Sequence, residues 1–149
     1  MKIVSCNLFG ICYFTVGILN KMSQTKKQKK GQWGEKQASL FLQRNGYEII
    51  KRNFEFYTLE LKGEIDIIAR DGDGVLSFVE VKTRGQGNGS AERATSVEKK
   101  VIKTRNIAIQ YCLQNNIDID RTKMKIEHVS VYPDKETKTV EFKKYVLEA

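Results

Sequence analysis

Two short segments, Gly63-Glu64-Ile65-Asp66 and Phe78-Val79-Glu80-Val81-Lys82, decide how this chain of 149 residues folds. Each has the apolar and β-branched content of a strand, and the turn sequence Asp71-Gly72-Asp73-Gly74 lies between them. Together they predict a β-hairpin. Because side chains alternate between the two faces of a strand, Glu80 and Lys82 must point to the same face.

The length of the connection predicts the register of this hairpin. Directly opposed residues of an antiparallel pair lie on the same face of the sheet. With residues 71–75 as the connection, Asp66 is opposite Glu80 and Glu64 is opposite Lys82. A slip by one residue would send Asp66 to the other face. We therefore predict that Asp66, Glu80 and Lys82 form a charged cluster on one patch of the sheet.

This D…ExK cluster contains the groups that phosphodiester hydrolysis requires. Two carboxylates one strand apart can hold a divalent cation, which polarises a phosphate and lowers the pKa of a bound water. A neighbouring ammonium group can position that water or stabilise the charge developing on the phosphate. Oxygen ligands favour Mg²⁺ or Mn²⁺ over zinc. Apolar neighbours such as Ile65, Phe78 and Val81 favour this interpretation over a solvated edge strand, where E-x-K is common.

The charge of the chain is unevenly distributed. The formal net charge is +8, but Lys2 and the five lysines of 21–30 account for most of it and leave +2 for residues 31–149. One basic strip remains near the predicted cluster, and it suits either phosphate contacts or a solvated helix face. Its members are Lys82, Arg84, Arg93, Lys99, Lys100, Lys103 and Arg105. Among them we take Arg84, Lys99, Lys100 and Lys103 as the candidate nucleic-acid-binding residues.

Cysteine and histidine usage excludes several chemistries. Cys6, Cys12 and Cys112 have no metal-type spacing and cannot all pair within one chain, so we expect a reducing compartment, the cytoplasm, and no structural disulfide. His128 is the single histidine, which argues against a Ser-His-Asp triad and a histidine-rich zinc site. With 40% hydrophobic and 30% charged residues, the composition is that of a soluble globular protein.

Residues 1–30 differ in composition from the rest. The stretch 3–19 is mostly apolar but contains polar residues, so a membrane anchor and a signal peptide are both candidate interpretations. We favour a third, in which translation starts at Met22 and a lysine-rich leader precedes the domain. The composition of Lys26–Lys30 predicts a disordered linker. The expected organisation is a leader and linker over 1–30 and a single domain over 31–149, with no membrane partner favoured.

Periodicity predicts the order αβββαββ. A helix is expected from near Gln32 to about Asn45, with Gly46 as its stop signal. Glu35 lies on the inward stripe of this helix, either as a functional carboxylate or as a first-turn glutamate favoured by the helix dipole. Strands are expected over 49–57, 64–70, 75–82, 123–131 and 139–145, with a second helix over 96–115. We expect one mixed sheet with helices packed on it, parallel where the second helix carries the chain across.

Several motifs together resemble a known family. They are Gly34-Glu35…Ala38, Gly46-Tyr47, Asn53 and the segments 63–69 and 78–84. They resemble the YraN-like uncharacterised bacterial proteins, UPF family 0102, which are placed in the PD-(D/E)xK nuclease superfamily and are similar to archaeal Holliday-junction resolvases. The resemblance covers about Gln32 to Val131. It implies a restriction-endonuclease-like mixed β-sheet flanked by helices.

The resemblance also implies roles for individual residues. Asp66 and Glu80 would be metal ligands, Lys82 the catalytic lysine, and Glu35 a helix carboxylate that reaches the metal directly or through water. Within the domain, the chain departs from the family at two places, and the leader before Met22 has no counterpart in the family pattern. It carries extra residues over Thr58–Lys62, and it has Lys125-Ile126-Glu127 where the family has Arg-x-Asp, a charge-conserving change.

Three functions follow as hypotheses. The first is a Mg²⁺- or Mn²⁺-dependent endonuclease acting on DNA, with branched DNA among the candidate substrates. The second is a nucleic-acid-binding protein that keeps the nuclease fold without catalysis. The third is a membrane-associated protein anchored by its first segment, whose lysine cluster meets anionic lipid. The favoured partner is nucleic acid, DNA in the first instance, and symmetric cutting of a junction would require a homodimer.

Overall fold

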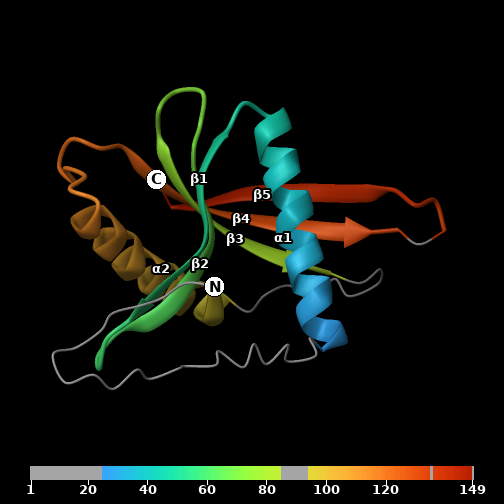
Figure 1. Ribbon diagram of the computed structural model, residues 1–149, viewed down its shortest axis with the longest axis horizontal. Helices are drawn as coiled ribbons and strands as arrows, with labels where there is room; N and C mark the ends of the chain where they lie inside the picture. The colour runs from blue at the N-terminus through green and yellow to red at the C-terminus, as the bar shows by residue number, and fades with distance from the viewer. Residues whose placement is uncertain (1–24, 85–93, 135, 149) are drawn as a thin grey trace, which may run out of the picture.

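The computed structural model describes residues 25–84, 94–134 and 136–148, with the backbone alone over 94–97. The elements follow one another in the predicted order αβββαββ. They are α1 (Lys26–Arg44), β1 (Glu48–Tyr57), β2 (Lys62–Arg70), β3 (Leu76–Thr83), α2 (Ala94–Gln114), β4 (Met124–Pro133) and β5 (Val140–Glu148) (Figure 1). The boundaries of the strands agree with the predictions to within a few residues.

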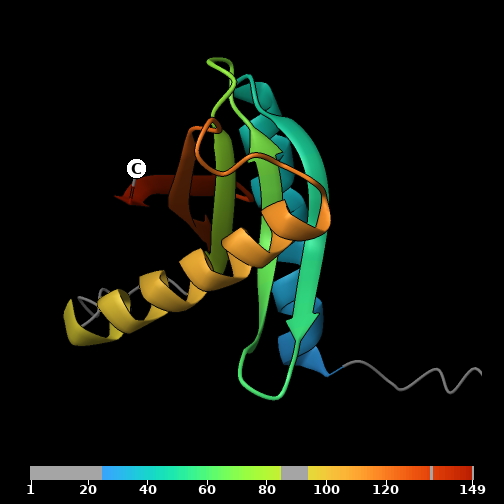
Figure 2. The ribbon, with the colours of Figure 1, turned by 90° about the vertical axis from the view of Figure 1, so that its left-hand side faces the viewer.

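The five strands form one mixed sheet in the order β1-β2-β3-β4-β5. Neighbouring strands are antiparallel except β3 and β4, which are parallel because α2 carries the chain across between them. Figure 2 shows α2 crossing the near face of the sheet, with α1 behind it. This architecture is restriction-endonuclease-like and confirms the predicted fold class.

Each face of the sheet carries its own hydrophobic core. The core under α1 is formed by Ala38, Leu42, Tyr47, Ile67, Ala69, Val79, Val81, Val129 and Val131. The core under α2 is formed by Phe54, Ile65, Ile68, Leu76, Phe78, Ile107, Ala108, Tyr111 and Cys112. The central strand β3 contributes to both, since its odd residues face α1 and its even residues face α2. Glu80 therefore belongs to the face of α2.

The first helix begins earlier than predicted. Its first residue is Lys26, so Lys26–Lys30 is helical and the disordered linker expected there is not observed. The cause is a capping box at Thr25. The Thr25 hydroxyl accepts the backbone N–H of Gln28 at 3.2 Å, and the Gln28 side chain accepts the N–H of Thr25 at 2.8 Å. Lysine and glutamine have high helix propensity, which extends the helix through the basic run.

The early start changes the interpretation of Glu35. This residue lies in the middle of α1, so a favourable interaction with the first-turn dipole does not explain it. The end of the helix is as predicted. Gly46 adopts φ +82°, a left-handed conformation that suits glycine, and the N–H of Tyr47 donates to the carbonyl of Leu42 at 3.0 Å.

The extra residues between the first two strands close a short hairpin. Thr58 and Leu61 are joined by backbone and side-chain hydrogen bonds, with Thr58 N donating to Leu61 O at 2.8 Å. The insertion therefore lengthens the tip of the β1–β2 hairpin.

The predicted translation start at Met22 lies outside the described residues. Two of the three cysteines, Cys6 and Cys12, lie outside them as well. Within residues 25–84 and 94–148, neither helix is long and apolar enough to cross a membrane.

Candidate active site

The β2–β3 hairpin has the predicted register. Its paired residues run from Arg70 and Leu76 to Ile67 and Val79, and the next residues along the two strands are Asp66 and Glu80. The ladder ends there, so the expected pair of Glu64 with Lys82 does not form. Instead, Asp66 Oδ2 accepts the backbone N–H of Val81 at 2.7 Å.

The sheet is irregular at the level of Asp66. Ile65 lies in the core under α2, whereas Ile67 lies in the core under α1, although regular alternation would place them on one face. On the neighbouring strand, Asn53 has φ +51° at the same level. Both strands therefore change sides at this point. The irregularity lets the Asp66 carboxylate reach the cleft beneath α1 while it stays within electrostatic range of Glu80.

A cleft of about 360 Å³ opens between the amino-terminal half of α1 and the end of β3, and its lining includes Glu35, Asp66 and Lys82. The helix comes close to the strand at Gly34, where any Cβ atom would overlap the hydroxyl of Thr83. Glu35 is thereby held at the edge of the sheet. Its Oε2 accepts Asn53 Nδ2 at 2.8 Å.

Glu80 projects on the other side and is held by two lysines. Its Oε1 lies 3.2 Å from Lys82 Nζ and also contacts Lys100 Nζ from α2. Lys100, which we expected to contact phosphates, therefore meets the predicted metal ligand directly. Lys82 is half-exposed. Glu80 and its two lysines place one negative and two positive charges beside Asp66.

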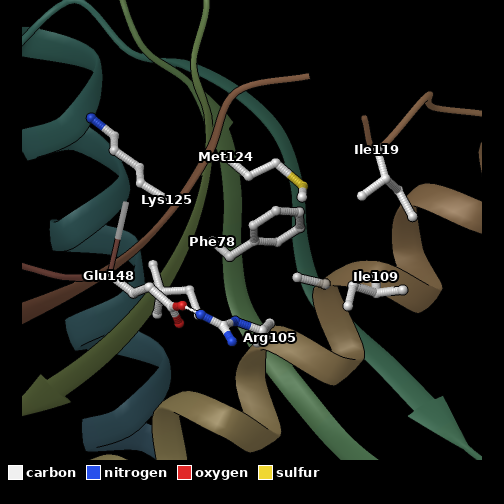
Figure 3. Close-up of a pocket in the computed structure, with 9 residues that line it drawn as sticks. Phe78, Arg105, Ile109, Ile119, Met124, Lys125 and Glu148 are labelled. Atoms are coloured by element: carbon white, nitrogen blue, oxygen red, sulfur yellow. Dashed lines mark ion pairs between the residues drawn. The ribbon is translucent and has the colours of Figure 1, made fainter. Parts of the chain in front are cut away.

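The rest of the basic strip is dispersed. Lys99 and Lys103 are exposed on α2, and the backbone N–H of Arg84 donates to the Val131 carbonyl at 2.8 Å. Arg105 forms an ion pair with Glu148 (Figure 3). Arg93 lies outside the described residues. Among the described members of the predicted strip, Lys82 and Lys100 contact Glu80.

The Arg105–Glu148 pair borders a separate cavity of about 190 Å³ between α2 and the start of β4. Its other lining residues are mostly apolar, among them Phe78, Ile109 and Met124 (Figure 3). This cavity contains no pair of acids and no lysine ammonium facing an acid, so it does not match the predicted chemistry. The cleft beneath α1 is lined by Glu35, Asp66 and Lys82, whereas Glu80 projects on the side of α2, so the predicted patch of Asp66, Glu80 and Lys82 does not lie on one face.

The surroundings of Asp66 disfavour its charged form. Burial and the nearby charges of Glu80, Glu35 and Glu64 raise the pKa of Asp66 from 3.8 to about 6, although the hydrogen bond from Val81 opposes the shift. The carboxylates offer hard oxygen donors of the kind that Mg²⁺ and Mn²⁺ prefer. A divalent ion would remove the repulsion among them, so the donor set fits such an ion.

Binding of one divalent ion by several of these carboxylates would require their side chains to move. Among the described residues, no three acidic, histidine or cysteine side chains already stand close enough together to share one ion. Glu80 is turned toward its lysines and Glu35 toward Asn53. For these groups to share an ion, both carboxylates would have to leave their present partners.

Sequence reasoning gave no role to Asn53, which connects two of the acids. Its Nδ2 donates to Glu35 at 2.8 Å and lies 3.4 Å from Glu64 Oε1. The signals were its place among the family motifs and the presence of an asparagine within a strand pattern. Asparagine tolerates positive φ better than most residues do, and this position requires it.

A second polar cluster, also missed, lies at the opposite ends of the central strands. Glu127 is fully buried, and it accepts hydrogen bonds from the Tyr47 hydroxyl at 3.1 Å and from the Ser77 hydroxyl. Two ammonium groups surround it, Lys144 Nζ at 3.2 Å and Lys125 Nζ at 3.6 Å. This is the position where the family has Arg-x-Asp, and the charge-conserving residues here form a closed network.

Lys125 connects this cluster to the hairpin turn. Its Nζ lies 2.7 Å from Asp71 Oδ2, and Asp71 Oδ1 accepts the N–H of Val75. Burial alone would lower the pKa of Lys125, but its bonds to Asp71 and Tyr47 and the charge of Glu127 raise it overall. The Asp71 pKa falls because of the same contact. The network fixes the turn that sets the register of Asp66 against Glu80.

The fold and the carboxylates at the end of the central strands define an α/β domain of the restriction-endonuclease-like type. The family described as "Uncharacterised protein family UPF0102" matches residues 34–131, a stretch that includes Glu35, Asp66, Glu80 and Lys82. The chain therefore belongs to the UPF0102 family.

Individual relatives agree with this assignment. A UPF0102 protein of Acetivibrio thermocellus is 36% identical over 126 residues, which cover 84% of this chain and 92% of that protein. One from Koribacter versatilis is 35% identical over 118 residues, covering 79% and 78%. One from Corynebacterium efficiens is 42% identical over 86 residues, covering 57% and 66%.

Proposed function

We propose that this protein is a metal-dependent nuclease that hydrolyses phosphodiester bonds of DNA with Mg²⁺ or Mn²⁺. The observation that carries the proposal is the position of Asp66. Its carboxylate is fixed by the Val81 N–H, one residue beyond the β2–β3 ladder, within the field of Glu80 and Glu35. Acids that raise the pKa of Asp66 in this way would favour a cation near it, and the ammonium group of Lys82 lies beside them.

Asp66, Glu80 and Glu35 would hold the ion, which when bound would polarise the phosphate and lower the pKa of a water. Lys82 lies 3.2 Å from Glu80, so its ammonium is in place to stabilise charge on a phosphate oxygen. Lys100 approaches the same carboxylate from α2 and supplies a second positive charge. The cleft beneath α1 leaves room for substrate beside Asp66.

The test is cleavage by wild-type protein and by Glu80→Gln, with Glu48→Gln as the matched control on an exposed strand position. Linear duplex, single-stranded DNA, RNA and a four-way junction would be offered with Mg²⁺ and with Mn²⁺. We expect cutting by wild type and by Glu48→Gln, and loss of at least about a hundredfold in Glu80→Gln. Cutting that survives in Glu80→Gln, or that is absent in wild type with every substrate, would contradict the proposal.

A second candidate function, binding of nucleic acid without catalysis, is favoured by one observation. Glu80 is already matched by two lysines, an arrangement that neutralises the carboxylate without a metal. For this function, binding should weaken steeply with salt and remain in Glu80→Gln, with no cutting by either protein. The cleavage assay therefore separates the two candidates.

A further inference from the structure

The strands β4 and β5 extend the candidate site across the sheet. In the parallel β3–β4 register, Glu80 pairs with His128 and Lys82 pairs with Ser130. In the antiparallel β4–β5 register, His128 pairs with Tyr145 and Ser130 pairs with Lys143. Paired residues share a face, so two rows run from the candidate site to the edge of the sheet. One row ends in Tyr145 and the other in Lys143.

These rows end in aromatic and basic side chains that are open to solvent. Tyr145 is 49% exposed, and the side chains of Lys143 and Lys82 are each 49% exposed. Lys143 Nζ lies 5.3 Å from the ring centre of Tyr132, which confirms that Tyr132 is on the same face. We call Lys82, Tyr132, Lys143 and Tyr145 the β4–β5 platform. Figure 1 shows this part of the sheet extending beyond α2.

From this platform, we propose that the protein binds an unpaired nucleic-acid strand across β4 and β5, next to Glu80 and Lys82. The proposal rests on the proposed function and narrows it to substrates with an unpaired strand at the point of cleavage. A half-exposed tyrosine ring on a sheet face stacks on a base, and a base offers its flat face only when it is unstacked.

The charges on the platform favour the same partner. Lys82 and Lys143 lie two strands apart, or about 10 Å, so a strand leaving Glu80 would pass both ammonium groups. Lys143 Nζ lies 3.4 Å from Glu141 Oε1, and the Glu141 side chain is 65% exposed, so it can turn away. The alternative occupant is a second copy of this chain paired along the edge strand β5. Two lysines beside the candidate site favour a polyanion over a second copy.

The test measures binding without turnover. The probe is a fluorescein-labelled oligothymidylate of about twelve nucleotides, a length within the site sizes of single-strand-binding proteins. It is titrated with the protein in EDTA, and binding is followed by fluorescence anisotropy. Tyr145→Ala should weaken binding about tenfold because it removes the stacking ring. Tyr145→Phe keeps the ring, and Tyr57→Ala removes a tyrosine that is 63% exposed on β1, so both should bind within about twofold of wild type.

Lys143→Ala supplies an independent readout. It should reduce the slope of log affinity against log salt by about 0.7, as expected for one lost phosphate contact on a single strand. Binding of a blunt duplex of the same length should be the same for wild type and Tyr145→Ala. The inference is overturned if the oligothymidylate is not bound. Equal binding by Tyr145→Ala and Tyr57→Ala would also overturn it.

The two proposals fail in different ways. If Glu80→Gln loses cutting but Tyr145→Ala binds the oligothymidylate as well as wild type does, the platform proposal is overturned and the nuclease proposal stands. Binding that depends on Tyr145 without any cutting supports the platform and contradicts the nuclease. Sedimentation of wild type and Tyr145→Ala tests the alternative occupant. A dimer that dissociates in Tyr145→Ala, with unchanged oligothymidylate binding, would overturn the platform in favour of a second copy.

Discussion

The two ends of the central strands both hold acids, but with opposite surroundings. At the end near the hairpin turn, Glu127 is buried among two lysines and the hydroxyls of Tyr47 and Ser77. At the other end, Asp66 receives one N–H from Val81 and faces Glu80, Glu35 and Glu64. At the first end, the charge of Glu127 is balanced by ammonium groups of the same protein. At the second end, burial and acidic neighbours raise the pKa of Asp66, while Lys82 and Lys100 pair with Glu80.

This difference in surroundings predicts how the acids at each end affect the stability of the fold. A buried acid with matched partners stabilises one arrangement of the chain, and removing it leaves uncompensated positive charge. A partly buried acid among other acids opposes folding, and removing its charge should stabilise the protein. The two ends should therefore respond in opposite directions to the same kind of substitution.

The largest effect is expected at the balanced end. Glu127→Ala leaves Lys125 and Lys144 without their shared carboxylate and should lower the free energy of unfolding by about 3–5 kcal/mol. Urea denaturation measures it, with Glu141→Ala at an exposed position of β5 as the control. A loss below about 1 kcal/mol would show that the network does not hold the hairpin turn.

Asp66→Asn should act in the opposite direction. Asparagine Oδ1 still accepts the Val81 N–H but carries no charge. At about pH 8 in EDTA we expect an increase in the free energy of unfolding of about 2 kcal/mol. The rise of the Asp66 pKa from 3.8 to about 6 represents roughly 3 kcal/mol, and we expect less because the carboxylate is partly exposed. A decrease in stability would contradict the contrast between the two ends.

The pH dependence of the wild type tests the same contrast. The Asp66 pKa is about 6 in the folded state and 3.8 when unperturbed, so the unfolded chain releases its proton first as pH rises. The contribution of this residue is favourable below about pH 4 and is lost as pH rises through about 6. Urea denaturation in EDTA across this range, compared with Asp66→Asn, should show a decline that the variant lacks.

Gly34→Ala should have an intermediate effect. Its Cβ would overlap the Thr83 hydroxyl, so α1 must move away from β3 and carry Glu35 with it. We expect a loss of about 1–3 kcal/mol. Thr83→Ala in the same chain removes the hydroxyl, so the double variant should recover most of the loss in a double-mutant cycle. Strictly additive effects would contradict this close approach.

The smallest effect on stability is expected at Asn53. Asn53→Gly keeps the positive φ but removes the hydrogen bond to Glu35, and should change the free energy of unfolding by less than about 1 kcal/mol. If Glu35 serves the site, cation affinity should fall although the fold is intact. Unchanged affinity would show that Asn53 does not position Glu35.

The sequence predicted what local patterns determine. The five-residue connection fixed the register of Asp66 against Glu80, because pairing advances residue by residue from the turn. The end of α1 at Gly46 followed from one glycine. The start of α1 was wrong because the capping box of Thr25 and Gln28 was overlooked in a basic run.

Features set by tertiary packing could not be predicted in this way. The change of face at Asp66 depends on the backbone of Asn53 in the neighbouring strand. The contact of Lys100 with Glu80 depends on the direction in which α2 crosses the sheet. The partners of Glu127 come from four separate segments of the chain, which no spacing connects.

The most direct test of the contrast between the two ends is calorimetric titration with Mn²⁺ of wild type, Asp66→Asn and Glu48→Gln. We predict that wild type and Glu48→Gln bind Mn²⁺ equally, and that Asp66→Asn, although more stable, loses the binding. Mn²⁺ binding that is equal in Asp66→Asn and wild type, or no binding by wild type, would contradict a cation site at Asp66.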